Sequence, residues 1–304
     1  MRILLAVDGS VSAELATRLV SGLDLPEGSI VRVVSVHEPS LDVLGMTWIG
    51  TGEDPLPAQT EAERVAQHRR EAVEAAERML ERPGIKVEGF LLRGRAGSEI
   101  VDEAKAFEAD LVVVGNRGHG AIASMVLGST AAEVVDHAPC PVLVARGDSL
   151  QPLAFADDGS ASARTAEQVI ASWPIFAGVP VHVVAVAEIQ VPMATGFTPG
   201  LYDQVMSSYT EAVEQARDEM RTDAEQTAAR LAEGGRPTSA DLLEGSPAQA
   251  LIDYVQSRSI ATLVMGTRGH TGLARLILGS TARNVLLHSP CSVLIVRERK
   301  PAEA

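Results

Sequence analysis

Residues 113–146 read VVGNRGHGAIASMVLGSTAAEVVDHAPCPVLVAR, and residues 264–297 read VMGTRGHTGLARLILGSTARNVLLHSPCSVLIVR. Aligned without gaps, the two stretches are identical at 18 of 34 positions and lie 151 residues apart. A second match, at a separation of 150 residues, joins LLAVDGSVSA at 4–13 to AFADDGSASA at 154–163. A repeat that spans half of the chain is far longer than the unit of a solenoid protein. The sequence therefore predicts two complete copies of one domain.

The length of the chain agrees with this duplication. The chain has 304 residues, whereas single domains commonly have roughly 100–200 residues. We therefore expect one domain at residues 1–148 and a second at 149–304, joined at Gly147-Asp148-Ser149.

The composition excludes several classes of function. Apolar residues make up 46% of the chain, which is enough for buried cores, but only 3% of the residues are aromatic. Sites that read single-stranded nucleic acid use stacked aromatic rings, and a net charge of −14 repels phosphate backbones. Two cysteines are too few for a disulfide scaffold, and no apolar run approaches the roughly 18 residues of a membrane span. We expect a cytoplasmic protein with neither a nucleic-acid nor a membrane partner.

The first half alternates the patterns of strands and helices, and the second half repeats the order. Strands are expected at 2–7, 30–36, 85–92, 111–114 and 142–145, and helices at 11–23, 60–82, 98–108 and 129–138. Strands that are separated by helices form a parallel sheet covered on both faces. The predicted fold class is α/β, with two tandem open-sheet domains, each a five-stranded parallel sheet with helices on both faces. Ligands bind such sheets at the carboxyl ends of the strands.

A glycine-rich loop follows the fourth strand in each half. The first half has Gly115-Asn116-Arg117-Gly118, nine residues, and then Gly128-Ser129-Thr130. The second half has Gly266-Thr267-Arg268-Gly269, nine residues, and then Gly279-Ser280-Thr281. Glycines let backbone N–H groups approach a ligand, and the start of a helix favours an anion. The arginines would offset the acidic charge locally, so the pattern suits a phosphate.

Better-known sites do not fit the sequence. The chain has no G-x-x-x-x-G-K-[ST] Walker loop, and the glycine loop matches no G-x-G-x-x-G dinucleotide fingerprint. Ser129 and Ser280 lack a G-x-S-x-G elbow, which argues against a nucleophilic serine. No Cys, His and acid cluster at metal-ligand spacing accompanies His119 or His270, so no metal site is expected.

The two loops resemble the ATP-binding signature of the universal stress protein family, which reads G-x-x-G, nine residues, and then G-[ST]. Other landmarks agree with this family: the opening strand that ends in V-D-G-S, Gly94-Arg95-Ala96 after the third strand, and the terminal strand P-C-P-V-L-V. The resemblance covers both halves and implies a tandem two-domain bacterial member with an adenine-nucleotide α-hydrolase-like fold.

The resemblance implies one ATP site in each half, with Mg²⁺ as a companion of the phosphates. The ends of the first two strands would meet the adenosine, through Ala6, Asp8 and Val36 in the first half and Ala156, Asp158 and Val186 in the second. The loops would wrap the ribose and phosphates, through Gly115, Asn116, Arg117, Gly118, His119 and Gly120, and through Gly266, Thr267, Arg268, Gly269 and His270. The helix starts would take the outer phosphates, through Gly128, Ser129 and Thr130, and through Gly279, Ser280 and Thr281.

One residue departs from the repeat at the second site. Asp157 stands beside Asp158, where the first half has Val7. If its side chain points into the site, it disfavours a polyphosphate or recruits a cation.

We expect the nucleotide to act by changing conformation or assembly. The protein would not be an enzyme beyond slow ATP hydrolysis, because no Walker lysine or general base is evident. An adenylating enzyme of the α-hydrolase group and a nucleotide-free scaffold stay open as alternatives. The resemblance implies pairing through the terminal strands, at 142–146 and 293–297, so that the two halves would form an internal pseudo-dimer, and whole chains could form a homodimer. We also expect that valine at both Gly115 and Gly266 abolishes nucleotide binding while the fold survives.

Overall fold

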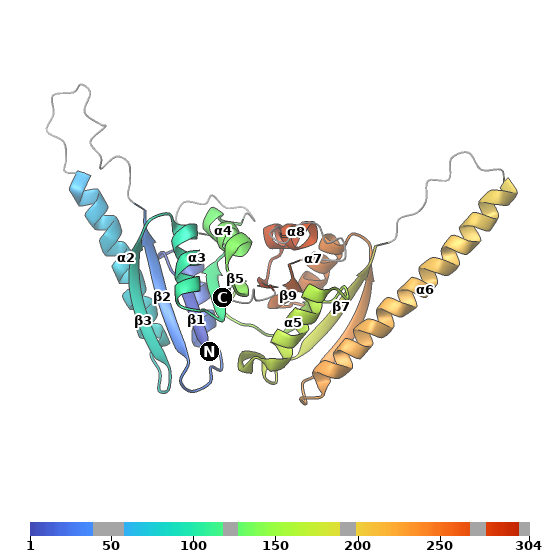
Figure 1. The fold of residues 1–304 in the computed structure, drawn as a ribbon, viewed down its shortest axis with the longest axis horizontal. Helices are drawn as coiled ribbons and strands as arrows, with labels where there is room; N and C mark the ends of the chain where they lie inside the picture. Colours follow the sequence, from blue (N-terminus) through green and yellow to red (C-terminus); the bar gives the residue numbers. More distant parts are fainter. Residues whose placement is uncertain (39–57, 118–126, 189–198, 268–277, 298–304) are drawn as a thin grey trace, which may run out of the picture. The chain divides into compact units, whose positions relative to one another are not determined.

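The computed structural model describes residues 1–38, 58–117, 127–188, 199–267 and 278–297, without the side chains of 58–62 and 199–204 (Figure 1). Gly118, His119, Gly120, Arg268, Gly269 and His270 lie outside the described residues. Contacts divide the chain into two compact units, one formed by Met1–Ser149 together with the segment from Cys291 onward, and the other by Leu150–Pro290. Each unit is described by itself below.

The first unit is built on a sheet with the strand order β3-β2-β1-β4-β5-β10. The bounds of its strands are β1 Arg2–Ala6, β2 Ile30–His37, β3 Lys86–Arg93, β4 Leu111–Gly115, β5 Val142–Ala145 and β10 Ser292–Val296. The first five strands are parallel, with Ala6 opposite both Val34 and Val114. The chain reverses its winding between β1 and β4, which makes the carboxyl ends of these strands the expected ligand position.

The last strand of the chain belongs to this first sheet. β10 pairs antiparallel with β5, and Leu294 lies opposite Leu143. The pairing covers the edge of β5, which would otherwise present unpaired N–H and C=O groups. The two compact units are defined by packing, whereas the predicted domains are defined by the sequence repeat, and the two divisions differ chiefly in the placement of this strand.

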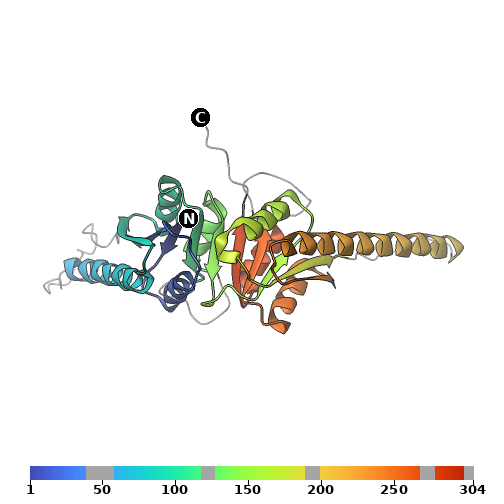
Figure 2. The ribbon, with the colours of Figure 1, turned by 90° about the horizontal axis from the view of Figure 1, so that it is seen from below.

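Among the described residues, the helices that cover the two faces of the first sheet are α1 Val11–Ser21, α2 Ala58–Leu80, α3 Ala96–Ala106 and α4 Ser129–His137. α1 packs against α2, and α3 packs against α4. Figure 2 shows the blue helices α1 and α2 on one side of these strands and the teal and green helices α3 and α4 on the other. The central strands β1, β4 and β5 are mainly apolar, and Ile3, Leu4 and Leu5 of β1 are fully buried.

The second unit repeats this arrangement with four parallel strands in the order β9-β6-β7-β8. The bounds of these strands are β6 Leu153–Ala156, β7 Val181–Ala187, β8 Thr238–Glu244 and β9 Thr262–Gly266. The helices are α5 Ala161–Ser172, α6 Pro199–Ala232, α7 Pro247–Ser257 and α8 Ser280–His288, with a short 3-10 turn at Pro174–Phe176. α6 has 34 residues against 23 in its counterpart α2, and it extends beyond β7 and β8 in Figure 1.

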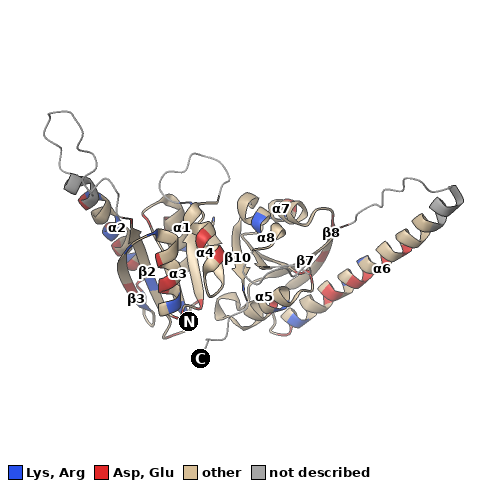
Figure 3. Cartoon of the chain, turned by 45° about the horizontal axis from the view of Figure 1, so that its top comes forward, with Lys and Arg blue, Asp and Glu red and all other residues tan. Residues whose placement is uncertain are grey.

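The two long helices differ in charge. α6 carries seven Asp and Glu residues against three Arg, whereas α2 carries five acidic residues against four Arg. Figure 3 shows, in red, the acidic positions along the coloured part of α6. The prediction of an α/β fold with an open, mostly parallel sheet in each repeat is confirmed. No helix in the part of the chain that the structure describes is long and apolar enough to cross a membrane.

Candidate functional site

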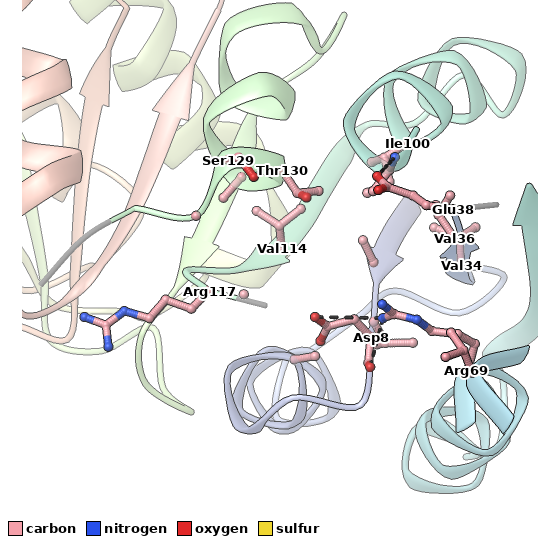
Figure 4. Close-up of a pocket in the computed structure, with 18 residues that line it drawn as sticks. Asp8, Val34, Val36, Glu38, Arg69, Ile100, Val114, Arg117, Ser129 and Thr130 are labelled. Atoms are coloured by element: carbon pink, nitrogen blue, oxygen red, sulfur yellow. Dashed lines mark hydrogen bonds and ion pairs between the residues drawn. The ribbon is translucent and has the colours of Figure 1, made fainter. Parts of the chain in front are cut away.

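The first unit contains a cavity of about 480 Å³ at the carboxyl ends of β1, β2 and β4. Its walls come from β1, α1, β2, α2, α3, β4 and α4 and from the loops beside them, and Figure 4 shows residues of these elements converging on one space. The lining residues are Ala6, Val7, Asp8, Ala13, Val34, Val36, Glu38, Val65, Arg69, Ala96, Ile100, Val114, Gly115, Arg117, Gly128, Ser129, Thr130 and Ala131. An open parallel sheet is expected to bind its ligand at this position.

The cavity brings together eight of the residues that the sequence predicted for the first site. They are Ala6, Asp8, Val36, Gly115, Arg117, Gly128, Ser129 and Thr130. Asn116 instead links the two ends of the loop, because its N–H donates to the carbonyl of Ala145 and its carbonyl accepts from the N–H of Gly128 at 2.8 Å. Three further predicted residues, Gly118, His119 and Gly120, lie in the segment that the structure does not describe.

Asp8 is fixed at the end of β1 by its neighbours. Its Oδ1 accepts from the N–H of Ser10 at 3.0 Å, and Arg69 of α2 donates from Nη1 to its carbonyl at 2.9 Å. The same guanidinium lies 3.9 Å from Oδ2. Both side chains are largely buried, with 25% of Asp8 and 21% of Arg69 exposed. The carboxylate is therefore held in one orientation at the wall of the cavity.

Ser10 joins the start of α1 to the glycine loop. Its Oγ accepts from the N–H of Ala13 at 3.2 Å, which is the hydrogen bond of a helix N-cap. The same hydroxyl donates to the carbonyl of Arg117 at 3.3 Å. One side chain therefore fixes both the first turn of α1 and the backbone at the beginning of the loop.

Gly115 is required by packing as well as by any ligand. A Cβ at this position would lie 2.8 Å from the carbonyl carbon of Ser12 and 2.9 Å from its oxygen. A Cβ on Gly266 would meet Ser162 in the same way, at 2.8 Å from the carbonyl carbon. These atoms are backbone and cannot turn aside. These contacts argue against the expectation that valine at both positions leaves the fold intact.

The start of α4 presents backbone donors to the cavity. Gly128 is the N-cap and has no side chain to accept from the first turn, and that turn contains no acidic residue. Ser129 and Thr130 follow at the cavity wall, and Figure 4 shows both side chains at its edge. Unpaired N–H groups and the helix dipole together favour an anion at such a position.

Two arginines line the cavity, and the one beside Asp8 is not the one that the sequence suggested. In Figure 4 the guanidinium of Arg117 points away from Asp8, whereas that of Arg69 lies beside it. Arg117 instead approaches Arg146, whose pKa falls to about 10, first through burial and then through the nearby Arg117 charge, while Cys291 acts in the opposite direction. Arg69 could not be predicted as a site residue, because its helix has the alternating charges of a solvated surface.

Glu38 is a second wall residue that sequence reasoning missed. It follows the end of β2, and its Oε1 accepts from the N–H of Ala96 at 2.8 Å. Ala96 begins α3, so the carboxylate lies at the positive end of that helix. The signal that could have found it is Gly94-Arg95-Ala96 after the third strand, which marks a helix start at the same edge of the sheet.

The second unit places the equivalent residues on equivalent elements. Asp158 accepts from the N–H of Ser160 at 3.0 Å, as Asp8 does from Ser10. The N–H of Gly279 donates to the carbonyl of Thr267 at 2.8 Å, as that of Gly128 does to Asn116. Other predicted residues stand at the ends of β6, β7 and β9 and at the start of α8, namely Ala156, Val186, Gly266, Ser280 and Thr281. Arg268, Gly269 and His270 lie outside the described residues.

Asp157 contacts α6 in the second unit. Its two oxygens accept from the N–H of Gly159 at 2.9 Å and from the hydroxyl of Thr227 at 2.8 Å. Arg230 of the same helix pairs with Glu167 at 2.6 Å, and its pKa is raised first by that hydrogen bond and also by the charge of Asp157. The carboxylate thus belongs to a polar contact between α5 and α6. Within the described residues, no group of three or more His, Cys, Asp or Glu could hold a metal ion.

Both halves of the chain are similar in sequence to known proteins. A model of the universal stress protein family matches residues 1–146 and again 150–297. Universal stress protein Slr1230 of Synechocystis is 26% identical over 317 aligned positions, covering 97% of this chain and 99% of the relative. A universal stress protein of Thermus aquaticus is 38% identical over 145 residues, which cover 47% of this chain and 97% of the relative.

The solved structures agree in fold. A universal stress protein from Archaeoglobus fulgidus superimposes with a TM-score of 0.62 at 19% sequence identity, and the match covers 98% of this chain and 97% of the other. The family model accounts for both halves of the sequence, and the relative from Synechocystis matches across the whole of it. The chain therefore belongs to the universal stress protein family as a tandem two-domain member, and this membership supports a role in the stress response.

Proposed function

We propose that this protein binds ATP, with one site in each domain, and acts through nucleotide-dependent changes in conformation or assembly. The observation that carries the proposal is the cavity of about 480 Å³ that joins Asp8 and Val36 to the start of α4. Aliphatic side chains such as Val34, Val36 and Ile100 line one part of it, and a helix N-terminus lies at another. This combination suits an adenine ring and a phosphate chain, respectively.

The acidic charge of the chain does not oppose this assignment. The net charge of −14 repels other anions, but salt screens this repulsion beyond about 10 Å at ordinary ionic strength. A nucleotide is short, and the N–H donors at the helix start act at hydrogen-bond distance. Mg²⁺ bound to the phosphates would reduce the remaining repulsion.

The site favours binding over rapid turnover. The charged side chains that line it are Asp8, Glu38, Arg69 and Arg117, and both Asp8 and Glu38 accept hydrogen bonds from backbone N–H groups. Fast phosphoryl transfer requires a group that orients the attacking water and a cation on the transferred phosphate. We therefore propose that the protein hydrolyses ATP slowly at most. We also propose that it is cytoplasmic and that two copies of the chain can form a homodimer. An adenylating enzyme and a nucleotide-free scaffold are the competing assignments.

Titration calorimetry with ATP and Mg²⁺ on the full chain tests the proposal. The variant of choice is Ser129→Glu combined with Ser280→Glu, because both serines are exposed at the first position of a helix. A carboxylate there suits the helix dipole and leaves the fold stable, but it repels a phosphate. Ala161→Glu at the first position of α5 is the matched control, since Ser160 already caps that helix.

We expect the wild type and the control to bind ATP and the double variant to lose binding. Wild-type protein that gives no heat at millimolar ATP would refute the proposal for both sites. Heating the purified protein and analysing the supernatant by anion exchange shows copurified nucleotide, which a scaffold would lack. Release of pyrophosphate with an acceptor substrate would favour the adenylating enzyme instead.

A further inference from the structure

Among the positions at which the two repeats differ is the arginine of α2 on the wall of the first cavity. α2 and α6 align on their buried ends, where Val73 and Leu80 correspond to Ala224 and Leu231 at a separation of 151 residues. The same separation relates the glycine loops. In this alignment Arg69 corresponds to Met220. The first unit therefore has a cation where the second has an uncharged thioether.

The arginines of α6 are engaged elsewhere in the second unit. Arg217 pairs with Glu244 at 3.0 Å, and Arg221 pairs with Asp218 on the same helix at 3.0 Å. Arg230, as noted above, pairs with Glu167. All three are thus bound to carboxylates other than Asp158, the counterpart of Asp8.

Arg69 supplies the positive charge beside Asp8 in the first cavity. Two carboxylates, Asp8 and Glu38, line it, and the guanidinium of Arg117 points away from Asp8. Arg69 lies within 3.9 Å of the Asp8 carboxylate and is 21% exposed. Replacing Arg69 by an uncharged residue would leave the carboxylates of Asp8 and Glu38 on the wall together with Arg117, whose guanidinium points away from Asp8. ATP carries several negative charges and responds to this difference, whereas adenosine carries none.

We infer that Arg69 makes the first site select a phosphorylated nucleotide over the uncharged nucleoside, and that the second site, with Met220, lacks this selectivity. The inference rests on the proposed function, because it concerns the same nucleotide sites. Arg69 also orients Asp8 through the hydrogen bond to its carbonyl. If Arg69 only positions Asp8, its loss weakens the binding of adenosine and ATP equally. If its charge selects the phosphates, its loss weakens the binding of ATP alone.

The experiment compares dissociation constants for ATP and adenosine in the full chain. Ser280→Glu is present throughout, so that the first site is measured alone. Arg69→Met copies the second repeat, Arg69→Gln keeps a donor for the Asp8 carbonyl without the charge, and Arg69→Lys keeps the charge. Arg78→Met is the matched control, because Arg78 lies on the same helix, is 69% exposed, and changes the net charge equally.

We expect the Met and Gln variants to weaken ATP binding about tenfold and adenosine binding less than twofold. The Lys variant keeps most of the preference for ATP, and Arg78→Met changes neither constant. In the reverse experiment, on a Ser129→Glu background, Met220→Arg strengthens ATP binding at the second site and leaves adenosine unchanged.

Equal weakening of both ligands in the Met and Gln variants would overturn the inference and leave Arg69 as a residue that only positions Asp8. Unchanged constants in those variants, or an unchanged ATP affinity in Met220→Arg, would also contradict it. These results leave the proposed function intact. If the protein with Ser280→Glu alone binds neither ATP nor adenosine, both the proposed function and the inference are refuted for the first site.

Discussion

Gly115 and Ser12 are in backbone contact, and the space between them cannot hold a side chain. A Cβ on Gly115 would lie 2.8 Å from the carbonyl carbon of Ser12, at the point where β4 crosses the first turn of α1. The glycine that begins the nucleotide loop is therefore also a packing residue of the sheet. Its conservation between the two repeats serves the fold whether or not a ligand is bound.

We predict that Gly115→Ala lowers the free energy of unfolding by about 1–3 kcal/mol, the usual cost of overpacking a filled site. Urea denaturation measures the change. Gly147→Ala is the control, because no atom lies within 4 Å of the Cβ that it adds. Equal stability of the two alanine variants would show that the backbone at Ser12 gives way easily.

The acid stability of the first unit should depend on Glu88. Hydrogen bonds from Lys86 and then from Arg32, at 2.6 and 2.7 Å, hold the pKa of this carboxyl below its usual value. A depressed pKa adds stability above the unfolded value of about 4.3, and this stability is lost as the pH falls through the folded value. Glu88→Gln should therefore be less stable than the wild type near neutral pH.

The difference between the two proteins should shrink as the pH falls below about 5. Urea denaturation across the acid range gives the unfolding free energy of each. Glu81→Gln removes an exposed carboxyl from the end of α2 and is the control. A gap between wild type and Glu88→Gln that stays constant down to the lowest pH would contradict the ion-pair explanation.

Tyr254 should give the second unit an alkaline transition. Burial, and then the hydrogen bond that its hydroxyl donates to Asp241 at 2.7 Å, raise the pKa of this phenol. A raised pKa contributes stability that is complete below the unfolded value of about 10 and is lost as the pH rises above it. Wild-type protein should therefore lose stability more steeply above pH ~10 than Tyr254→Phe.

Tyr254→Phe should also cost about 1–2 kcal/mol near neutral pH, because Asp241 loses a donor. Absorbance of tyrosinate near 295 nm follows ionisation directly, and the variant should lack the phase at highest pH. Tyr209→Phe on α6 is the control for the loss of one tyrosine. Identical alkaline denaturation of wild type and Tyr254→Phe would rule out this role for the phenol.

The two thiols should be protected in the folded protein. Cys140 is 1% exposed and Cys291 is 7% exposed, and each stands just before a terminal strand. We predict that Ellman's reagent reacts slowly with native protein and rapidly with both thiols in denaturing urea. Rapid reaction of one thiol under native conditions would show that the strand after it, β5 or β10, opens readily.

Much of the fold could be predicted from the sequence because local patterns determine it. The continuous apolar run of β4 is typical of a buried parallel strand, and Asp8-Gly9-Ser10 marks the turn and cap before α1. Because the second half of the sequence repeats the first, the order of strands and helices in the second unit follows from the same patterns. The pairing of β5 with β10 is found as expected, while the pseudo-dimer of whole domains stays a prediction.

The candidate site was predicted less completely, because its wall depends on contacts across the sheet. Ser129 and Thr130 follow from the loop pattern, but Arg69 lies 61 residues from Asp8 on a helix whose charges are typical of a surface. Its role depends on how closely α2 packs on the sheet, and charge patterns alone do not report this. The direction of the Arg117 side chain also depends on packing, so it could not be predicted from the sequence.

The antiparallel pairing of β5 with β10 has a consequence for biosynthesis. The sheet of the first unit is completed by a strand that begins 147 residues after β5 ends. At translation speeds of about 5–20 residues per second, the ribosome takes about 7–30 s to make the intervening chain. The nascent protein therefore carries an uncovered strand edge during that interval, when it is open to wrong pairing or to chaperones. Its maturation is limited by when the last strand emerges.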